Sequence, residues 1–177
     1  KQAAAKLNPN IRVIAADASA SALARYFSDG FWGMPRLHDL DAASLTAACR
    51  ERGVTQIIPS RDGELSFFAL HRETLKKAGI NVMVSTPEAV EICLDKLRFA
   101  SFGIEKGLPV IPAYESLPAI AEGTWVVKER YGAGSLSMGL NLSAAEAFAH
   151  SDRLKAPIFQ PFLSGMREFS ADIYVDR

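Results

Sequence analysis

Short apolar segments alternate with helical patterns through the first half of the chain. The apolar runs expected to form buried strands are residues 11–17, 55–59 and 80–84. Residues 42–52 and 65–78 have helical spacing, and each is followed by a glycine, Gly53 or Gly79, which suits the left-handed end of a helix. Because strands joined through helices run in the same direction, this alternation predicts an α/β fold built on a parallel sheet.

The composition argues against two classes of partner. Among 177 residues, Lys and Arg total 20 and Asp and Glu total 20, so the formal net charge is zero. No global field is therefore expected to attract nucleic acid or a membrane surface. Apolar residues make up 49% of the chain, which is sufficient for a folded core.

The cysteines and the absence of targeting patterns favour a cytoplasmic location. Cys49 and Cys93 lie on the apolar sides of predicted helices, so we expect both to be buried free thiols. The sequence shows no signal peptide and no apolar run long enough to span a bilayer. His38, His71 and His150 are scattered, and no cluster has the spacing of metal ligands.

Residues 125–139 combine an apolar strand pattern with a loop suited to phosphate. The apolar run ends at Lys128, a compact positive charge, and a flexible segment follows. Glycine allows positive φ, successive amides can form an anion-binding concavity, and serine hydroxyls add donors. The glycines and serines of this Gly/Ser loop are Gly132, Gly134, Ser135, Ser137 and Gly139. Their spacing matches neither a Walker A motif nor Gly-x-Gly-x-x-Gly, so an ordinary hairpin loop with a solvated lysine is an alternative.

Residues 158–175 are predicted to form a strand, a turn at Ser164-Gly165 and a second strand. Polar and apolar residues alternate after the turn, so Glu168 is expected to share a face with Ser170 and Asp172. A solvated acid paired with the neighbouring Arg167 is the alternative interpretation of Glu168.

The Gly/Ser loop, the strand after it and the Glu-x-Ser-x-Asp pattern together resemble the ATP-grasp family. A Cys-x-Asp-Lys segment that ends at Lys96 is similar to the start of the ATP-grasp domain in carbamoyl-phosphate-synthase-like proteins. The resemblance implies that ATP is the ligand and that Lys96, Lys128 and the Gly/Ser loop hold its phosphates. It also implies that Glu168 binds the ribose hydroxyls.

The resemblance assigns the adenine pocket to the strand before the turn, largely through backbone groups. The residues concerned are Gln160, Pro161, Phe162 and Leu163. Gln160 stands where a glutamate is common in the family, and Pro161 has no amide hydrogen to donate. We therefore expect a looser preference for adenine than is usual in the family.

The resemblance also implies two domains. Residues 1–85 correspond to a Rossmann-like, parallel-sheet pre-ATP-grasp domain that lacks its first strand. Residues 86–177 correspond to the N-terminal part of an incomplete α+β ATP-grasp domain, with an entry strand at residues 108–112. The family's metal-binding glutamate and catalytic arginine are expected outside this chain. Mg²⁺ is thus implied for the intact protein, with no metal ligand and no catalytic residue assigned here.

The implied activity is ATP-dependent joining of a carboxylate to an amine or ammonia through an acyl phosphate. ATP and a small-molecule carboxylate or amine are then the partners, and a homodimer is compatible with the resemblance. A non-catalytic nucleotide-binding module is the alternative, so whether the chain belongs to an active enzyme stays open.

Two features of the first half of the chain allow more than one interpretation. Asp17 at a strand end also fits the ribose-binding acid of a dehydrogenase, although no glycine turn accompanies it. Arg61, Asp62 and Glu64 either face a substrate or form a solvated loop and helix start at which acids are favoured by the helix dipole.

Overall fold

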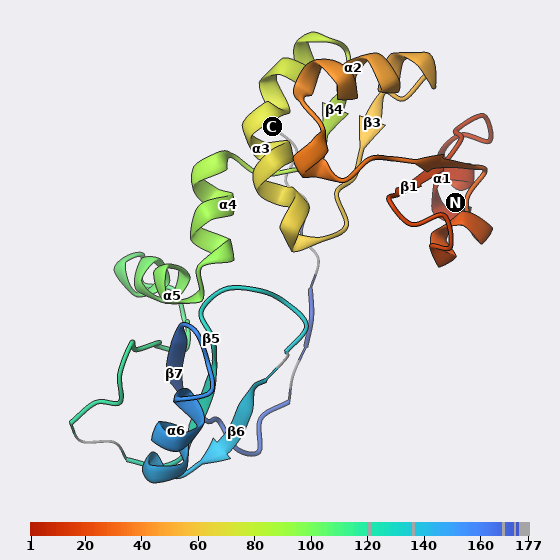
Figure 1. Ribbon diagram of the computed structural model, residues 1–177. Helices are drawn as coiled ribbons and strands as arrows, with labels where there is room; N and C mark the ends of the chain where they lie inside the picture. The colour runs from red at the N-terminus through yellow and green to blue at the C-terminus, as the bar shows by residue number, and fades with distance from the viewer. Residues whose placement is uncertain (120–121, 136, 168, 172, 174–177) are drawn as a thin grey trace. The chain divides into compact units, whose positions relative to one another are not determined.

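The computed structural model describes residues 1–119, 122–135, 137–167, 169–171 and 173. The chain divides into two compact units, Lys1–Ser85 and Thr86–Arg177, whose elements are labelled in Figure 1. Each unit is described by itself. Within the described residues, no helix has the length and apolar character needed to cross a membrane.

The first unit alternates short strands with helices, as its sequence pattern predicts. Its strands are β1 (Ile14–Asp17), β2 (Gly30–Gly33), β3 (Gln56–Ile57) and β4 (Asn81–Val82). Its helices are α1 (Gln2–Leu7), α2 (Ala42–Glu51) and α3 (Asp62–Lys77), with 3₁₀ turns η1 (Leu23–Tyr26) and η2 (Leu37–Asp39). β1 pairs with β2 and β3 with β4, both in parallel, so the predicted parallel pairing is confirmed as two separate pairs.

Helices α2 and α3 bury the core of the first unit. Asp41 caps α2 by accepting a 2.7 Å hydrogen bond from the Ser44 amide, and Gly53 follows the helix with φ +65°. The buried side chains come from α2, α3 and the segment around β4; they are Leu45, Cys49, Phe68, Leu75, Ile80 and Val82. Burial of these side chains holds the helices against the strands.

The second unit contains a three-stranded antiparallel sheet. Its helices are α4 (Pro87–Leu94), α5 (Lys96–Glu105) and α6 (Ala144–Ser151). Its strands are β5 (Trp125–Glu129), β6 (Gly139–Leu142) and β7 (Pro157–Pro161), in the order β6-β5-β7. This mixture of antiparallel strands and helices agrees with the expected α+β character of residues 86–177.

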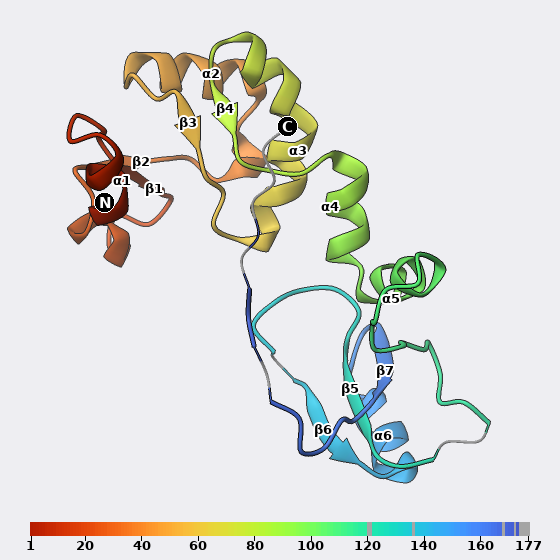
Figure 2. The same ribbon diagram turned by 180° about the vertical axis from the view of Figure 1, so that it is seen from behind.

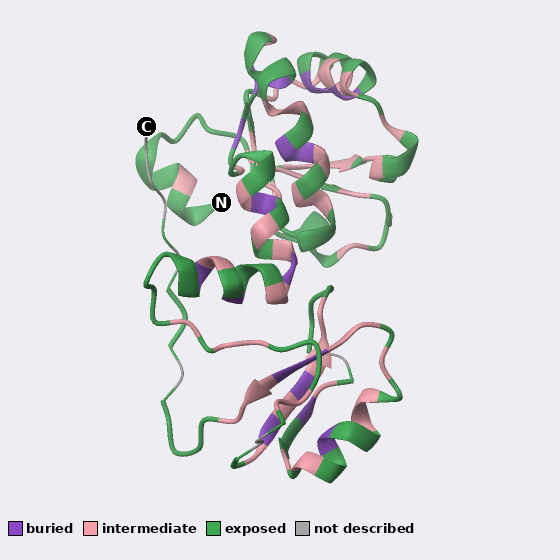
Figure 3. Ribbon diagram, turned by 90° about the vertical axis from the view of Figure 1, so that its left-hand side faces the viewer, coloured by how far each residue is buried: buried purple, intermediate pink, exposed green. Residues whose placement is uncertain are grey.

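Helix α6 lies against one face of this sheet, as the view from behind shows (Figure 2). Trp125, Val127, Ala147 and Phe159 form the buried cluster between sheet and helix, and Figure 3 shows buried positions on β5, β7 and α6. The helix starts with the capping box that Ser143 and Glu146 predict: the Ser143 hydroxyl accepts from the Glu146 amide, and the Glu146 carboxylate accepts from the Ser143 amide.

Three sequence expectations are wrong in the described residues. Residues 108–112 form no strand, because Pro109 and Pro112 lack the amide hydrogens of a ladder. The second strand of residues 158–175 is absent from its described residues, and Phe169 is 85% exposed because no described strand pairs with it. Cys93 is exposed, whereas Cys49 is buried as expected.

Candidate nucleotide-phosphate site

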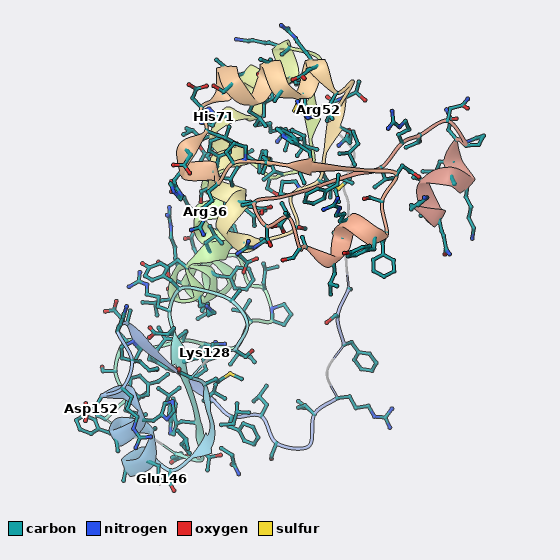
Figure 4. The ribbon with its side chains drawn as sticks, turned by 45° about the vertical axis from the view of Figure 1, so that its right-hand side comes forward. Arg36, Arg52, His71, Lys128, Glu146 and Asp152 are labelled. Atoms are coloured by element: carbon teal, nitrogen blue, oxygen red, sulfur yellow. The ribbon has the colours of Figure 1, made fainter. Side chains whose placement is uncertain are left out.

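The register of β5 and β7 determines which side chains share a face of the sheet. Lys128 lies opposite Ile158, and Val126 lies opposite Gln160. Directly opposed residues project to the same face, so Lys128 and Gln160 share one face. The alternate residues, including Val127, pack against α6 on the other face. The lysine and the first residue of the proposed adenine segment are thus brought to the sheet face away from α6, and Figure 4 shows Lys128 on β5.

Lys96 reaches the Gly/Ser loop from helix α5, of which it is the first residue. Its backbone amide donates to the Arg130 carbonyl at 3.2 Å. Its ammonium donates to the carbonyls of Gly132 at 2.7 Å and Arg130 at 3.3 Å. Lys96 therefore lies beside the loop that follows Lys128, although 36 residues separate it from Gly132 in sequence.

The two lysines are close enough to influence each other. Burial lowers the pKa of the half-buried Lys128, and the positive charge of Lys96 lowers this pKa further. In the part of the chain that the structure describes, neither ammonium has a carboxylate within 4.0 Å. Two like charges without a described counter-ion form a site that suits a polyanion.

Four described residues of the Gly/Ser loop have positive φ. Gly132 and Gly134 have φ values of +91° and +83°, a region open to glycine. Ser135 and Ser137 also have positive φ, +52° and +60°, which is uncommon for residues with a side chain. Such conformations concentrate in turns whose amides bind anions and at functional sites.

Gly139 ends the loop at a place where no side chain fits. An added Cβ would lie 2.6 Å from Leu142 Cδ1 and 3.1 Å from the His150 ring. The same ring anchors the loop, because His150 Nε2 donates to the Ser137 carbonyl at 2.8 Å. No local pattern in the sequence links His150 to a loop residue 13 positions away.

Asp95 and Arg130 form an ion pair at the start of the loop that sequence reasoning also missed. Asp95 is 7% exposed, and it accepts from Arg130 Nε at 2.8 Å and Nη2 at 2.7 Å. The Arg130 guanidinium lowers the pKa of Asp95 to about 2, despite the opposing effect of burial. The one available signal was the placement of Asp95 and Arg130 beside the two proposed phosphate lysines.

The proposed adenine segment is described from Gln160 to Leu163. Gln160 Nε2 donates to the Ile111 carbonyl at 3.2 Å, so this amide is already oriented. The Phe162 amide donates to the Thr124 carbonyl at 2.8 Å, which continues the ladder beyond β7. Glu168, expected to bind ribose, and Asp172 lie outside the described residues.

The acids that follow β3 form a helix start, and the described residues contain no cluster of metal ligands. Asp62 and Glu64 lie in the first turn of α3, and Glu64 accepts a hydrogen bond from the Ser60 amide. This geometry is that of a helix start favoured by its dipole, and the helix begins earlier than residue 65. No three His, Cys, Asp or Glu side chains of the described residues gather as metal ligands, so this part of the chain does not fit a Mg²⁺ site.

A family model describes the first half of the chain. Residues 1–83 match the PylC-like, N-terminal domain. No curated protein sequence matches the chain.

Solved structures resemble the chain in fold. N5-carboxyaminoimidazole ribonucleotide synthetase from Thermus thermophilus has a TM-score of 0.61 at 18% identity, covering 91% of this chain and 43% of its own. The biotin carboxylase domain of Hydrogenobacter thermophilus 2-oxoglutarate carboxylase has a TM-score of 0.58 at 16% identity, and the match covers 92% of this chain and 41% of that domain's chain. Rhizobium etli pyruvate carboxylase has a TM-score of 0.55 at 22% identity, and the match covers 92% of this chain and 17% of the carboxylase chain.

This chain therefore spans less than half the length of each of these three proteins. All three are ATP-grasp enzymes, and identities in this range establish the fold alone. The PylC-like match over residues 1–83 and this shared fold both agree with the resemblance of the chain to the ATP-grasp superfamily.

Proposed function

We propose that residues 86–177 bind the triphosphate of ATP between Lys96, Lys128 and the Gly/Ser loop. The observation that carries the proposal is the approach of two lysines from different elements to one loop. Neither has a described carboxylate partner, although burial and mutual repulsion both disfavour charge on Lys128. A phosphate chain would offset this repulsion and would accept hydrogen bonds from the ammonium groups and loop amides.

The ladder of β5 and β7 supports an adenine contact at Pro161 and Leu163. Because the Phe162 amide bonds to Thr124 on the β5 side, the backbone groups of residues 161 and 163 point to the other edge. On that edge Tyr114 already pairs with Phe159. The Pro161 carbonyl and the Leu163 amide supply one acceptor and one donor, which match the amino group and ring nitrogen of adenine.

The missing amide hydrogen of Pro161 does not weaken this proposal. That group would point to the same outer edge, beside the segment at Phe159 that Tyr114 occupies. An adenine bound through the carbonyl of Pro161 and the amide of Leu163 requires no donor from Pro161. Glu168 is retained as the proposed ligand of the ribose hydroxyls, since a carboxylate accepts two hydroxyl hydrogen bonds.

For the whole protein we propose an ATP-dependent ligase that activates a carboxylate as an acyl phosphate and transfers it to an amine or ammonia. The Hydrogenobacter relative was crystallised with MgADP and bicarbonate, and that ligand set supports a carboxylate-type substrate for this fold. The carbamoyl-phosphate-synthase-like character is part of the same proposal. The described residues do not fit a Mg²⁺ site, so no step through the metal is derived.

A nucleotide-binding module without chemistry is the second candidate. The two candidates share the ATP site and differ in turnover. Release of phosphate from ATP in the presence of bicarbonate or an amino acid, with ammonia, would favour the ligase.

The proposed site is tested by titration calorimetry with ATP and with inorganic triphosphate. Lys128→Ala should weaken the binding of both ligands about tenfold or more, because a charged hydrogen bond to phosphate contributes about 1.5–3 kcal/mol. Lys106→Ala is the matched control, since Lys106 is paired with Glu105 on the surface. An unchanged ATP affinity in Lys128→Ala would exclude the proposed role.

Glu168→Gln separates nucleotide recognition from phosphate binding in the same assay. It should weaken ATP by about 1–2 kcal/mol through loss of the ribose bonds. Binding of inorganic triphosphate should stay the same. Equal losses for both ligands would remove the ribose assignment.

A further inference from the structure

Asp95 is the one buried charged residue among those that the structure describes. Its carboxylate accepts hydrogen bonds from five donors, two of which belong to the Arg130 guanidinium. The Tyr131 hydroxyl donates at 3.2 Å, and the amides of Leu97 and Arg98 each donate at 3.1 Å. A buried carboxylate with this many partners is satisfied as an anion and holds its donors in fixed positions.

These donors come from two segments that each carry one of the phosphate lysines. Asp95 precedes Lys96 and caps α5, whereas Arg130 and Tyr131 follow Lys128 at the end of β5. The segments are 35 residues apart in sequence. The ion pair therefore joins the backbone next to one lysine to the backbone next to the other.

The repulsion between the two lysines has to be offset by another interaction. Lys96 and Lys128 carry like charges, so in the absence of an anion they do not stabilise the contact between the two segments. The Asp95–Arg130 pair is bidentate and mostly shielded from water, which restricts orientation as well as distance. It can offset the repulsion and keep both ammonium groups at the loop.

We infer that the Asp95–Arg130 pair is a positioning element that holds Lys96 against the first residues of the Gly/Ser loop, in the geometry that receives phosphate. The inference rests on the proposed function. Preorganised contacts of this kind increase affinity because the ligand need not order them.

Direct phosphate binding by Arg130 is the competing role, and the hydrogen bonds oppose it. Nε and Nη2 are bonded to Asp95, and Nη1 donates to Glu115 at 3.0 Å. All three guanidinium nitrogens are thus already directed to carboxylates. The Arg130 carbonyl, in contrast, accepts from both the amide and the ammonium of Lys96.

A double-mutant cycle between Asp95 and Lys96 tests the inference. ATP affinity is measured by calorimetry for the native 177-residue chain, Asp95→Asn, Lys96→Ala and the double variant, with the folded fraction checked by urea unfolding. Asp95→Asn should weaken ATP about tenfold in the native background and less than about twofold in Lys96→Ala, because it acts through Lys96. Glu91→Gln, which removes the exposed pair with Arg98, is the control and should leave the affinity unchanged.

Tyr131→Phe provides a second variant if Asp95→Asn does not fold. It removes one hydrogen bond from Asp95 without leaving a buried charge unpaired, so about a threefold loss confined to the background with Lys96 is expected. Equal losses in both backgrounds, or no loss at full folding, would overturn the positioning role. A native chain that binds no ATP would instead overturn the proposed function, and this inference with it.

Discussion

At the residue scale, the acids of the second unit differ in what stabilises their charge. Asp95 is buried against Arg130, whereas Glu129 accepts hydrogen bonds from the backbone amides of Lys155 and Ala156. Those amides lower the pKa of Glu129, and the guanidinium lowers that of Asp95. Asp95 combines a charge partner with burial, so its ionisation has the larger consequence for stability.

Stability should therefore depend on pH through Asp95. Its pKa is about 2 in the folded chain and 3.8 in the reference state, so its contribution is full above pH 4 and declines as the pH falls toward 2. The free energy of unfolding of Asp95→Asn should lie about 2 kcal/mol or more below that of the native chain at pH 7, because Asn also leaves Nε and Nη2 of Arg130 without their carboxylate partner. The gap should narrow between pH 4 and pH 2.

Urea unfolding followed by Trp125 fluorescence in a Trp32→Phe background measures this gap. Glu105→Gln serves as control, because it removes an exposed ion pair and should show a gap near zero at every pH. A gap for Asp95→Asn that stays constant down to pH 2 would contradict the assignment.

At the element scale, the position of helix α5 depends on close packing at Gly103 as well as on its cap, Asp95. An added Cβ at Gly103 would lie 2.8 Å from Val110 Cγ2, so the helix approaches the segment after it closely. The Leu108 amide donates to the Gly103 carbonyl at 2.8 Å and fixes the chain reversal. The first turn of the same helix carries Lys96, so displacement of α5 would also move that lysine.

Gly103→Ala should destabilise the second unit even though alanine is the better helix former. The propensity gain is about 1 kcal/mol, and overpacking costs about 1–3 kcal/mol, so the clash with Val110 should prevail. Thermal unfolding by circular dichroism measures the change. Ser101→Ala on the exposed side of the same helix is the control and should be neutral or stabilising. The double variant Gly103→Ala with Val110→Ala should regain stability relative to Gly103→Ala, and a failure to do so would exclude the clash as the cause.

At the scale of the molecule, the proposed nucleotide contacts all belong to one of the two units. Lys96, Lys128 and the Gly/Ser loop lie in Thr86–Arg177. Each unit has its own buried cluster, and each contains one tryptophan, Trp32 or Trp125. Ligand binding should thus stabilise the second unit by mass action.

ATP should raise the urea midpoint that Trp125 reports and leave the midpoint that Trp32 reports unchanged. In Trp32→Phe, Trp125 reports the second unit, and ATP at about 100 times its Kd should stabilise it by about 2.7 kcal/mol. In Trp125→Phe, Trp32 reports the first unit, whose urea midpoint should stay unchanged. Equal shifts of both midpoints would show that the units unfold together.

Local signals in the sequence were sufficient for much of the fold. The glycine after α2 and the strand that contains Lys128 were both predicted, because each depends on neighbours within a few residues. The resemblance to the ATP-grasp superfamily, with which the fold agrees, rested on the order of three such motifs. The alternation of residues 168–175 was also local, yet its described residues form no strand, because a strand requires a partner for its backbone.

The contacts that shape the site depended on the three-dimensional fold. Asp95 meets Arg130 across 35 residues, and His150 meets Ser137 across 13, and neither pair leaves a periodic trace in the sequence. Which face of β5 presents Lys128 follows from the pairing register with β7, which the sequence pattern of either strand alone does not specify. Patterns of neighbouring residues encode helices, caps and turns, whereas these long-range pairs arise only when closure of the intervening chain is offset by packing and hydrogen bonds.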